Sequence, residues 1–482
     1  MIRESIARRC SHAAADGERV CCRGVGQPSR LSEWDGRPAF PPQAKLRTSA
    51  APRLRLGKPH AADYLSSPVK TSAPIIALLA IAFTARAAEA EWPQFRGPAG
   101  QGISDATGVP TEWSETKNVA WKVEVPGKGW SSPVLARGRL YLTTAVGDSA
   151  SGITLHALCL DAADGRTLWD TEVFRPEPES TAAMHRKNSL ASGTPIVTAD
   201  RLYVHFGHMG TAALDLAGKV VWRQNDLKYQ PVHGNGGSPI LVDGSLVFSC
   251  DGNEAPFIVA LDAGTGAMRW KTPRNSPAKK PFSFSTPLAI TVSGATQIIS
   301  PGSGLVGGYD ARDGHEIWHV NYGEGYSVIP RPIFSHGLIF VSSSFNKPTL
   351  FAIRPDGASA DATETNVAWT LAKAVPHSAS MLVLGNELYF VSDAGIASCA
   401  DALTGEIHWT ERLGGGFSAS PIAAEGRVYF QNETGTGYVL KAGKNFELLS
   451  KNEIGEPTLA SYAVTNGAIF LRSEKCLRKI TR

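Results

Sequence analysis

A phrase ending in tryptophan returns along this chain at intervals of about 40 to 53 residues, and it constrains the fold more than any other feature. Val259 to Trp270 reads VALDAGTGAMRW, and close variants end at Trp169, Trp318 and Trp409. The full series consists of Trp121, Trp169, Trp222, Trp270, Trp318, Trp369 and Trp409. A fixed period of this length is the signature of a repeat architecture in which each unit is one supersecondary element.

Each repeat unit reads as four short strands. A Ser/Thr-Pro step followed by apolar residues precedes most of the tryptophans, as in SSPVLARGRLYL from Ser131 and GSPILVDGSLVF from Gly237. Alternating apolar residues bounded by turn residues predict antiparallel strands, and four strands in about 40 to 50 residues are typical of a propeller blade. Within the phrase we expect Asp to accept backbone N–H groups, Gly to adopt a positive φ and Trp to be buried between adjacent blades.

The number of units predicts the closure of the ring. Six units end at Trp169, Trp222, Trp270, Trp318, Trp369 and Trp409. A seventh runs from Ser418 to about Ser450, and an eighth, from Pro457 to Ile480, has only three strands. NVAWKVEV, Asn118 to Val125, supplies the missing fourth strand and removes the exposed edges. We therefore predict an all-β, eight-bladed β-propeller of four-stranded antiparallel blades over residues 118–482, closed by an N-terminal strand.

The first ninety residues differ from the rest. Residues 1–70 carry a net charge of +7 and the remainder a net −3, so no basic stripe indicates nucleic-acid binding. Residues 69–90, VKTSAPIIALLAIAFTARAAEA, have the pattern of a secretory signal cleaved after Ala90. Residues 1–68 are then a disordered leader or the product of a mis-assigned start. We expect an exported, periplasmic or extracellular protein that begins at Glu91, with residues 91–117 as an N-terminal extension and no transmembrane segment in the mature chain.

The cysteines do not follow the pattern of a disulfide framework. Cys159 and Cys399 occupy the same position of different repeats, two residues before the Asp of the phrase. Equivalent slots in different blades favour small apolar packing residues. We therefore expect the cysteines after residue 90 to be free and buried.

The repeat resembles the family of pyrroloquinoline-quinone-like propeller repeats. The family's tryptophan-docking phrase, Ala-x-Asp-x-x-Thr-Gly-x-x-x-Trp, is matched in full by Ala260, Asp262, Thr265, Gly266 and Trp270. Asp401, Thr404, Gly405 and Trp409 match all but its first position. The resemblance covers about Trp92 to Ile480 and implies a propeller fold. It implies two kinds of function, because the family contains non-catalytic BamB-type scaffolds and quinoprotein dehydrogenases.

One end of the central channel is where a propeller of this kind would bind a ligand. Loops that enter the innermost strands, and loops between the second and third strands, bring aromatic, histidine and amide side chains to that end. The candidate ligand-binding residues are Trp130, His233, Asn235, Asp251, Arg331 and His377. No residue is assigned a catalytic role, and none is assigned as a metal ligand.

The resemblance also implies what an active quinoprotein would need. Such an enzyme would use Ca²⁺ held by Glu, Asn and Asp, a catalytic Asp and typically an adjacent cysteine pair. The cysteine pair here is Cys21-Cys22, outside the propeller, and Asp251 and Asn253 are only the best remaining candidates for metal ligands. We therefore expect a monomeric, non-catalytic scaffold without a cofactor that binds a protein or small ligand at the channel mouth, and no nucleic acid. The alternative is a dehydrogenase that uses pyrroloquinoline quinone with calcium to oxidise alcohols or sugars.

Overall fold

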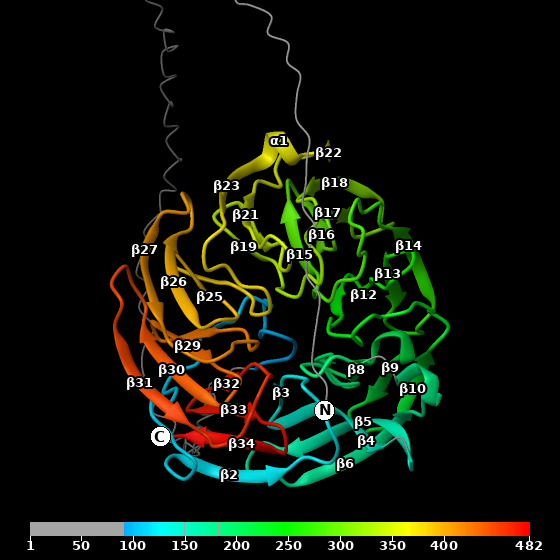
Figure 1. The fold of residues 1–482 in the computed structure, drawn as a ribbon. Coiled ribbons are helices and arrows are strands. Elements are labelled where there is room, and N and C mark those ends of the chain that lie inside the picture. The colour runs from blue at the N-terminus through cyan, green and yellow to red at the C-terminus, as the bar shows by residue number, and fades with distance from the viewer. Residues whose placement is uncertain (1–90, 149, 182–183) are drawn as a thin grey trace, which may run out of the picture. The chain divides into compact units, whose positions relative to one another are not determined.

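Eight small antiparallel sheets form a β-propeller, as the tryptophan spacing predicts (Figure 1). The computed structural model describes residues 91–148, 150–181 and 184–482. The predicted leader and signal, residues 1–68 and 69–90, lie outside the described residues. Within the described part of the chain, no helix is both long and apolar enough to cross a membrane.

The first four blades follow each other along the chain, each from its inner to its outer strand. Blade 1 contains β3 (Val134–Ala136), β4 (Arg139–Asp148), β5 (Gly152–Asp161) and β6 (Thr167–Phe174). Blade 2 contains β7 (Ile196–Val197), β8 (Arg201–His205), β9 (Thr211–Asp215) and β10 (Val220–Gln224). Blade 3 contains β11 (Ile240–Val242), β12 (Ser245–Cys250), β13 (Phe257–Asp262) and β14 (Met268–Pro273). Blade 4 contains β15 (Leu288–Val292), β16 (Ala295–Pro301), β17 (Leu305–Asp310) and β18 (Glu316–Asn321).

The remaining blades keep this order until the last. Blade 5 contains β19 (Ile333–Ser335), β20 (Leu338–Ser342), β21 (Leu350–Ile353) and β23 (Val367–Leu371). Blade 6 contains β24 (Leu382–Leu384), β25 (Glu387–Val391), β26 (Ile396–Asp401) and β27 (Ile407–Arg412). Blade 7 contains β28 (Ile422–Ala424), β29 (Arg427–Gln431), β30 (Thr436–Lys441) and β31 (Leu448–Glu453). Blade 8 contains β32 (Ala463–Thr465), β33 (Ala468–Arg472), β34 (Cys476–Thr481) and, from the other end of the propeller, β2 (Val119–Glu124).

The predicted closure of the ring is confirmed. β2 pairs antiparallel with β34, with Val119 opposite Ile480 and Glu124 opposite Cys476. Figure 1 shows this outer strand, coloured for the beginning of the propeller, beside the red strands of its end. Glu456 stabilises the pairing of β2 with β34, because its carboxylate pairs with Lys122 Nζ of β2 at 3.1 Å and with Arg478 Nη2 of β34 at 2.9 Å.

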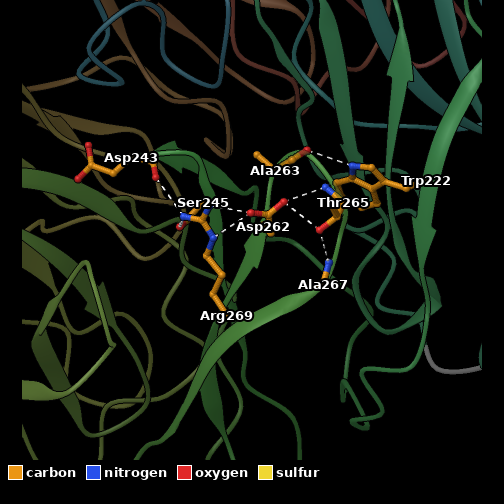
Figure 2. Close-up of polar contacts among 8 residues, drawn as sticks. All are labelled: Trp222, Asp243, Ser245, Asp262, Ala263, Thr265, Ala267 and Arg269. Carbon is orange, nitrogen blue, oxygen red and sulfur yellow. Dashed lines mark hydrogen bonds and ion pairs between the residues drawn. The ribbon is translucent and has the colours of Figure 1, made fainter.

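The recurring phrase forms a self-bonded turn between the third and fourth strands of a blade, shown for blade 3 in Figure 2. Asp262 Oδ1 accepts hydrogen bonds from the backbone N–H and the hydroxyl of Thr265, both at 2.9 Å. Arg269 donates to Asp262 Oδ2 from Nε and Nη2, at 3.1 and 2.7 Å. Gly266 has a φ of 76°, the left-handed conformation that glycine adopts readily. The predicted roles of Asp and Gly are thus confirmed.

The tryptophan of one blade docks under the turn of the next. Trp222 Nε1 donates to the carbonyl of Ala263 at 3.0 Å, from blade 2 to blade 3. Its ring lies where a Cβ on Gly266 would stand, at 2.6 Å from Cε3, so the turn needs glycine for space as well as for φ. Trp121, Trp169, Trp270 and Trp409 also donate to a backbone carbonyl of the following blade.

Two tryptophans of the series depart from this pattern. Trp318 Nε1 donates to Gln297 Oε1 of its own blade at 3.0 Å. Blade 5 replaces the short turn by a longer connection: its third and fourth strands are joined through β22 (Ala360–Asp361) and helix α1 (Thr363–Asn366), and β22 pairs parallel with β18 of blade 4. Trp369 packs under Gly405, but its Nε1 has no hydrogen-bond partner within the described residues.

The hydrophobic core is divided into the seams between neighbouring blades. One buried cluster joins blades 7, 8 and 1, and others join each further pair of neighbours around the ring. The cysteines of the described residues belong to these seams or to the strands beside them. As predicted, Cys159, Cys250, Cys399 and Cys476 are free and buried.

The N-terminal extension contacts several blades, and the sequence did not predict these contacts. Trp92 exchanges backbone hydrogen bonds with Leu135 of blade 1. Arg96 Nη2 donates to the carbonyl of Met381 in blade 6, at 2.6 Å. β1 (Ile103–Ser104) then adds a parallel strand to β28 of blade 7. The segment therefore holds non-neighbouring blades at a fixed spacing around the channel.

Candidate binding site at the channel mouth

The position of the Ser/Thr-Pro step, which five of the eight blades keep as Ser/Thr-Pro, builds a ring around the channel. One residue from each blade contributes: Ser132, Thr194, Ser238, Thr286, Arg331, Ser380, Ser420 and Ser461. Seven backbone N–H groups of this ring donate to the side-chain hydroxyl of the next blade, at 2.9 to 3.1 Å. The ring thus sets the inner strands in register with one another.

Arg331 interrupts the hydroxyls of the ring in blade 5. Its side chain is 2% exposed. Its Nε donates to the carbonyl of Pro287 at 3.1 Å, and its Nη1 to the carbonyl of Phe95 in the N-terminal extension at 2.7 Å. Burial lowers the pKa of Arg331 to about 9. Arg331 therefore connects the ring to the extension.

A cavity of about 490 Å³ lies in the channel, with the hydroxyl ring at one end. Phe95, from the extension, lines the cavity together with the seven hydroxyl residues, and we call this end the floor. Side chains from the loops that enter the inner strands form the walls. The volume lies within the range of small-molecule sites, about 300 to 1,000 Å³.

Aromatic rings follow one another along the wall that blades 3 to 6 form. We call His233, Phe284, Tyr326, Phe345 and His377, all of which line the cavity, the aromatic belt. Ring centroids are 6.2 Å apart for His233 and Phe284, 6.3 Å for Tyr326 and Phe345, and 4.9 Å for Phe345 and His377. Phe282 packs behind the belt and connects its two halves through Phe284 and Tyr326. The belt offers flat apolar surface to a ligand.

An ion pair connects loops from separated blades at the same cavity. Lys187, from the loop before blade 2, places Nζ 2.7 Å from Glu433 Oε1 of blade 7. Ser418 donates to the same carboxylate oxygen at 2.7 Å. We call the ion pair between Lys187 and Glu433 the latch. Because Lys187 and Ser418 both line the cavity, the latch restricts one side of it.

The carboxylate of Asp393, which lines the cavity, is also engaged. Asp393 Oδ1 accepts the backbone N–H groups of His377 and Ser378, at 3.0 and 2.9 Å. Its Oδ2 accepts the Ser378 hydroxyl at 2.7 Å. Asp393 thus fixes the loop that carries His377 in the belt.

Of the six candidate ligand-binding residues, the structure brings three to the cavity. Trp130, His233 and His377 line it, from blades 1, 3 and 6. Burial, together with nearby His185 and Lys280, lowers the pKa of His233, so its neutral imidazole is favoured. That these residues bind a ligand stays a prediction.

The other three candidates are engaged inside the protein. Asn235 lies beside the main cavity and donates to the carbonyl of Gly237 at 3.0 Å. Arg331 is the ring residue described above. Asp251 is 3% exposed and faces Arg274, whose Nε is 2.9 Å from its Oδ1, while the Ser283 hydroxyl donates to its Oδ2 at 2.5 Å. Burial raises the pKa of the Asp251 carboxyl, and Arg274 opposes that shift.

Reasoning from the sequence missed the hydroxyl ring, Phe345 of the belt and the latch. The ring could have been recognised in the sequence, because the Ser/Thr-Pro step recurs at a similar distance before most of the tryptophans. The latch could not, since Lys187 and Glu433 are 246 residues apart.

The comparisons with solved structures agree with this fold. BamB from Moraxella catarrhalis superposes with a TM-score of 0.55 at 12% identity, over 76% of this chain and 97% of that one. Quinohemoprotein alcohol dehydrogenase ADHIIG from Pseudomonas putida HK5 gives 0.58 at 12% identity, over 81% and 80%. The computationally designed Ika8 protein gives 0.55 at 9%, over 76% and 100%. At these identities the similarity shows the fold alone.

A search of curated proteins found no match. One family model matches overlapping segments of the propeller, residues 103–281, 158–399 and 302–445. Its description is outer membrane protein assembly factor BamB, and together the segments cover more than half of the chain. The resemblance to this group of propellers is thus confirmed, and the chain belongs to the family described as outer membrane protein assembly factor BamB.

Proposed function

We propose that the protein is an exported, non-catalytic propeller that binds a small ligand, or a side chain of a partner protein, in the cavity at its channel mouth. The observation that carries the proposal is the cavity itself, whose belt of five aromatic and imidazole rings offers apolar surface. Concave, largely apolar sites with a few placed polar groups are the usual form of a binding site. The family's description as an outer membrane assembly factor supports a binding role over catalysis.

The donor set of the cavity does not fit the calcium-bound quinone of the alternative function. Ca²⁺ takes six to eight oxygen ligands, with carboxylates prominent among them. Among the described residues of the cavity and the latch, Asp393 already accepts hydrogen bonds from His377 and Ser378, and Glu433 Oε1 pairs with Lys187 and accepts from Ser418. Asp251, the best metal ligand in the sequence, faces the guanidinium of Arg274 instead. The dehydrogenase is therefore the weaker candidate.

An assay of redox activity tests this choice. The purified protein would be titrated with pyrroloquinoline quinone and Ca²⁺, and dye reduction would be followed with alcohols and aldoses. We expect no substrate-dependent reduction. Turnover that requires both the quinone and Ca²⁺, and that is lost in Asp393→Asn, would overturn the proposal.

A screen for binding tests the cavity directly. Small aromatic and carbohydrate probes would be examined by ligand-detected NMR with the wild type and two variants. Phe345→Ala removes a ring of the belt, whereas Phe446→Ala removes a ring that packs on Trp409 between blades 6 and 7. We expect probes that lose binding in the first variant and keep it in the second. Probes that bind both variants equally, or a screen without binders, would contradict the assigned site.

Export is a separate part of the proposal. The pattern of residues 69–90 predicts cleavage after Ala90. The propeller contacts begin immediately afterwards, at Trp92. Terminal sequencing of secreted protein should therefore read Glu91-Trp92-Pro93, and a mature chain that retains residues before Val69 would contradict cleavage at this place.

A further inference from the structure

Most hydroxyls of the ring keep an O–H group that no acceptor within the described protein uses. Each hydroxyl oxygen accepts a backbone N–H from the neighbouring blade, so its own O–H remains available as a donor. Among the described residues, six of the seven O–H groups have no acceptor in the protein; the exception is Ser420, which donates to Ser380. All seven residues are at most 5% exposed and line the cavity. The floor therefore offers hydroxyl groups whose O–H is free to donate to a molecule in the cavity.

Two buried arginines lie behind this floor without a balancing carboxylate. Arg331 belongs to the ring, and its guanidinium bonds only to the carbonyls of Pro287 and Phe95. Arg96, 1% exposed, donates to the carbonyl of Met381, while its Nε and Nη1 have no partner within the described residues. Burial is the main cause that lowers the pKa of each to about 9, and no carboxylate offsets it.

The guanidinium groups behind the floor are thus positively charged, and most hydroxyls of the floor keep an O–H that can donate to a ligand. A buried charge is stabilised by an opposite charge nearby, and ionised acceptors form stronger hydrogen bonds than neutral ones. Asp393, which lines the cavity, accepts backbone N–H groups of the loop that enters β24, and Glu433 of the latch pairs with Lys187. An anionic group on a ligand would complement both the charge and the donors.

We propose that the cavity binds an aryl carboxylate, with the carboxylate on the hydroxyl floor and the aromatic body against the belt. The inference rests on the proposed function, because it names the ligand class for the same cavity. The carboxylate oxygens accept O–H groups of the ring, including those of Thr194 and Thr286. The ring system lies among His233, Phe284 and Phe345, where flat apolar surface is available.

Paired probes separate the floor from the belt. Naphthalene-2-carboxylate and naphthalene-2-carboxamide have nearly the same shape and differ in charge. Isothermal titration of both into the purified protein should give a dissociation constant about tenfold lower for the carboxylate, because its hydrogen bonds are charge-assisted.

Two variants test whether the preference comes from the ring. Thr194→Val with Thr286→Val removes two O–H donors and keeps the shape of the side chains. Thr211→Val, the control, removes a buried hydroxyl that bonds His205 in blade 2. We expect the preference to fall to about threefold or less in the double variant and to persist in the control. If the double variant does not fold, Thr286→Val alone serves instead, and it should lower the preference for the carboxylate while Thr211→Val leaves it unchanged.

The other outcomes separate this inference from the proposed function. Equal binding of the two probes, weakened by Phe345→Ala, would support the proposed site and overturn the anionic floor. A preference for the carboxylate that persists in the double variant would also overturn it, since Lys187 or the histidines would then be its source. Binding of neither probe would contradict the aryl carboxylate as the ligand class.

Discussion

Replacement of Trp270 by alanine should lower the free energy of unfolding by about 3–5 kcal/mol, the usual cost of a large-to-small change of an aromatic core residue. Trp270 is 8% exposed, and its Nε1 donates to the carbonyl of Ala311 in blade 4 at 3.2 Å. A Cβ on Gly314 would stand 2.4 Å from Trp270 Cε3, so the ring lies directly against backbone. Because backbone of the next blade cannot collapse into the space, alanine would leave a cavity and an unpaired carbonyl.

Equilibrium unfolding in guanidinium chloride, followed by far-ultraviolet circular dichroism, measures this loss. Met268→Ala is the matched control, since Met268 lies on the same strand, β14, and is 54% exposed. The control should change the free energy by no more than about 0.5 kcal/mol. A loss below about 1 kcal/mol for Trp270→Ala, or one equal to the control, would refute the docking of tryptophans between blades as a source of stability.

Further predictions concern the seam, the latch and the cysteines. Burial opposes ionisation of Glu456, but bonds from Ser473, Arg478 and Lys122 overcome it and lower the pKa of its carboxyl to about 2. Because the folded pKa lies below the ordinary value of 4.5, this stabilisation is present above pH 4.5 and is lost as the pH falls toward 2. Glu456→Gln should therefore flatten the dependence of the unfolding midpoint on pH between these values. An unchanged dependence would contradict the pairing. Deletion of residues 118–125 should lower the unfolding midpoint, because two strand edges become exposed, and an unchanged midpoint would refute closure. Lys187→Met should raise the association rate of the neutral naphthalene-2-carboxamide in stopped-flow experiments, and an unaltered rate would show that the latch does not restrict entry. Iodoacetamide should label Cys159, Cys250, Cys399 and Cys476 only after denaturation, as peptide mass spectrometry would record; labelling in the native protein would contradict their burial.

The fold could be predicted from the sequence because its determinants are local and repeated. Asp262, Thr265 and Gly266 form a turn whose bonds lie within six residues, so the phrase is readable wherever it occurs. The closing strand could be predicted by counting, since blade 8 lacked one strand and Trp121 stood alone before the first unit. The path of Trp92 to Ser104 across several blades could not, because its partners are set by the shape of the finished ring.

The binding site could be predicted only in part. The loops that reach the channel were identified, and Trp130, His233 and His377 do line the cavity. Asp251 and Arg331 looked like site residues because charged groups in loops are usually exposed, yet both are buried against partners supplied by distant segments, Arg274 and Phe95. Such pairings depend on three-dimensional neighbours that one sequence does not reveal.

Protection of histidines by a bound ligand tests most directly the claim that the channel mouth is the binding site. The protein would be treated with diethyl pyrocarbonate with and without naphthalene-2-carboxylate, and the modification of each histidine would be measured by mass spectrometry. His315, exposed on an outer turn of blade 4, is the internal control. We expect the ligand to protect His233 and His377 and to leave His315 unchanged. Equal modification of His233 and His377 with and without the ligand would contradict this claim.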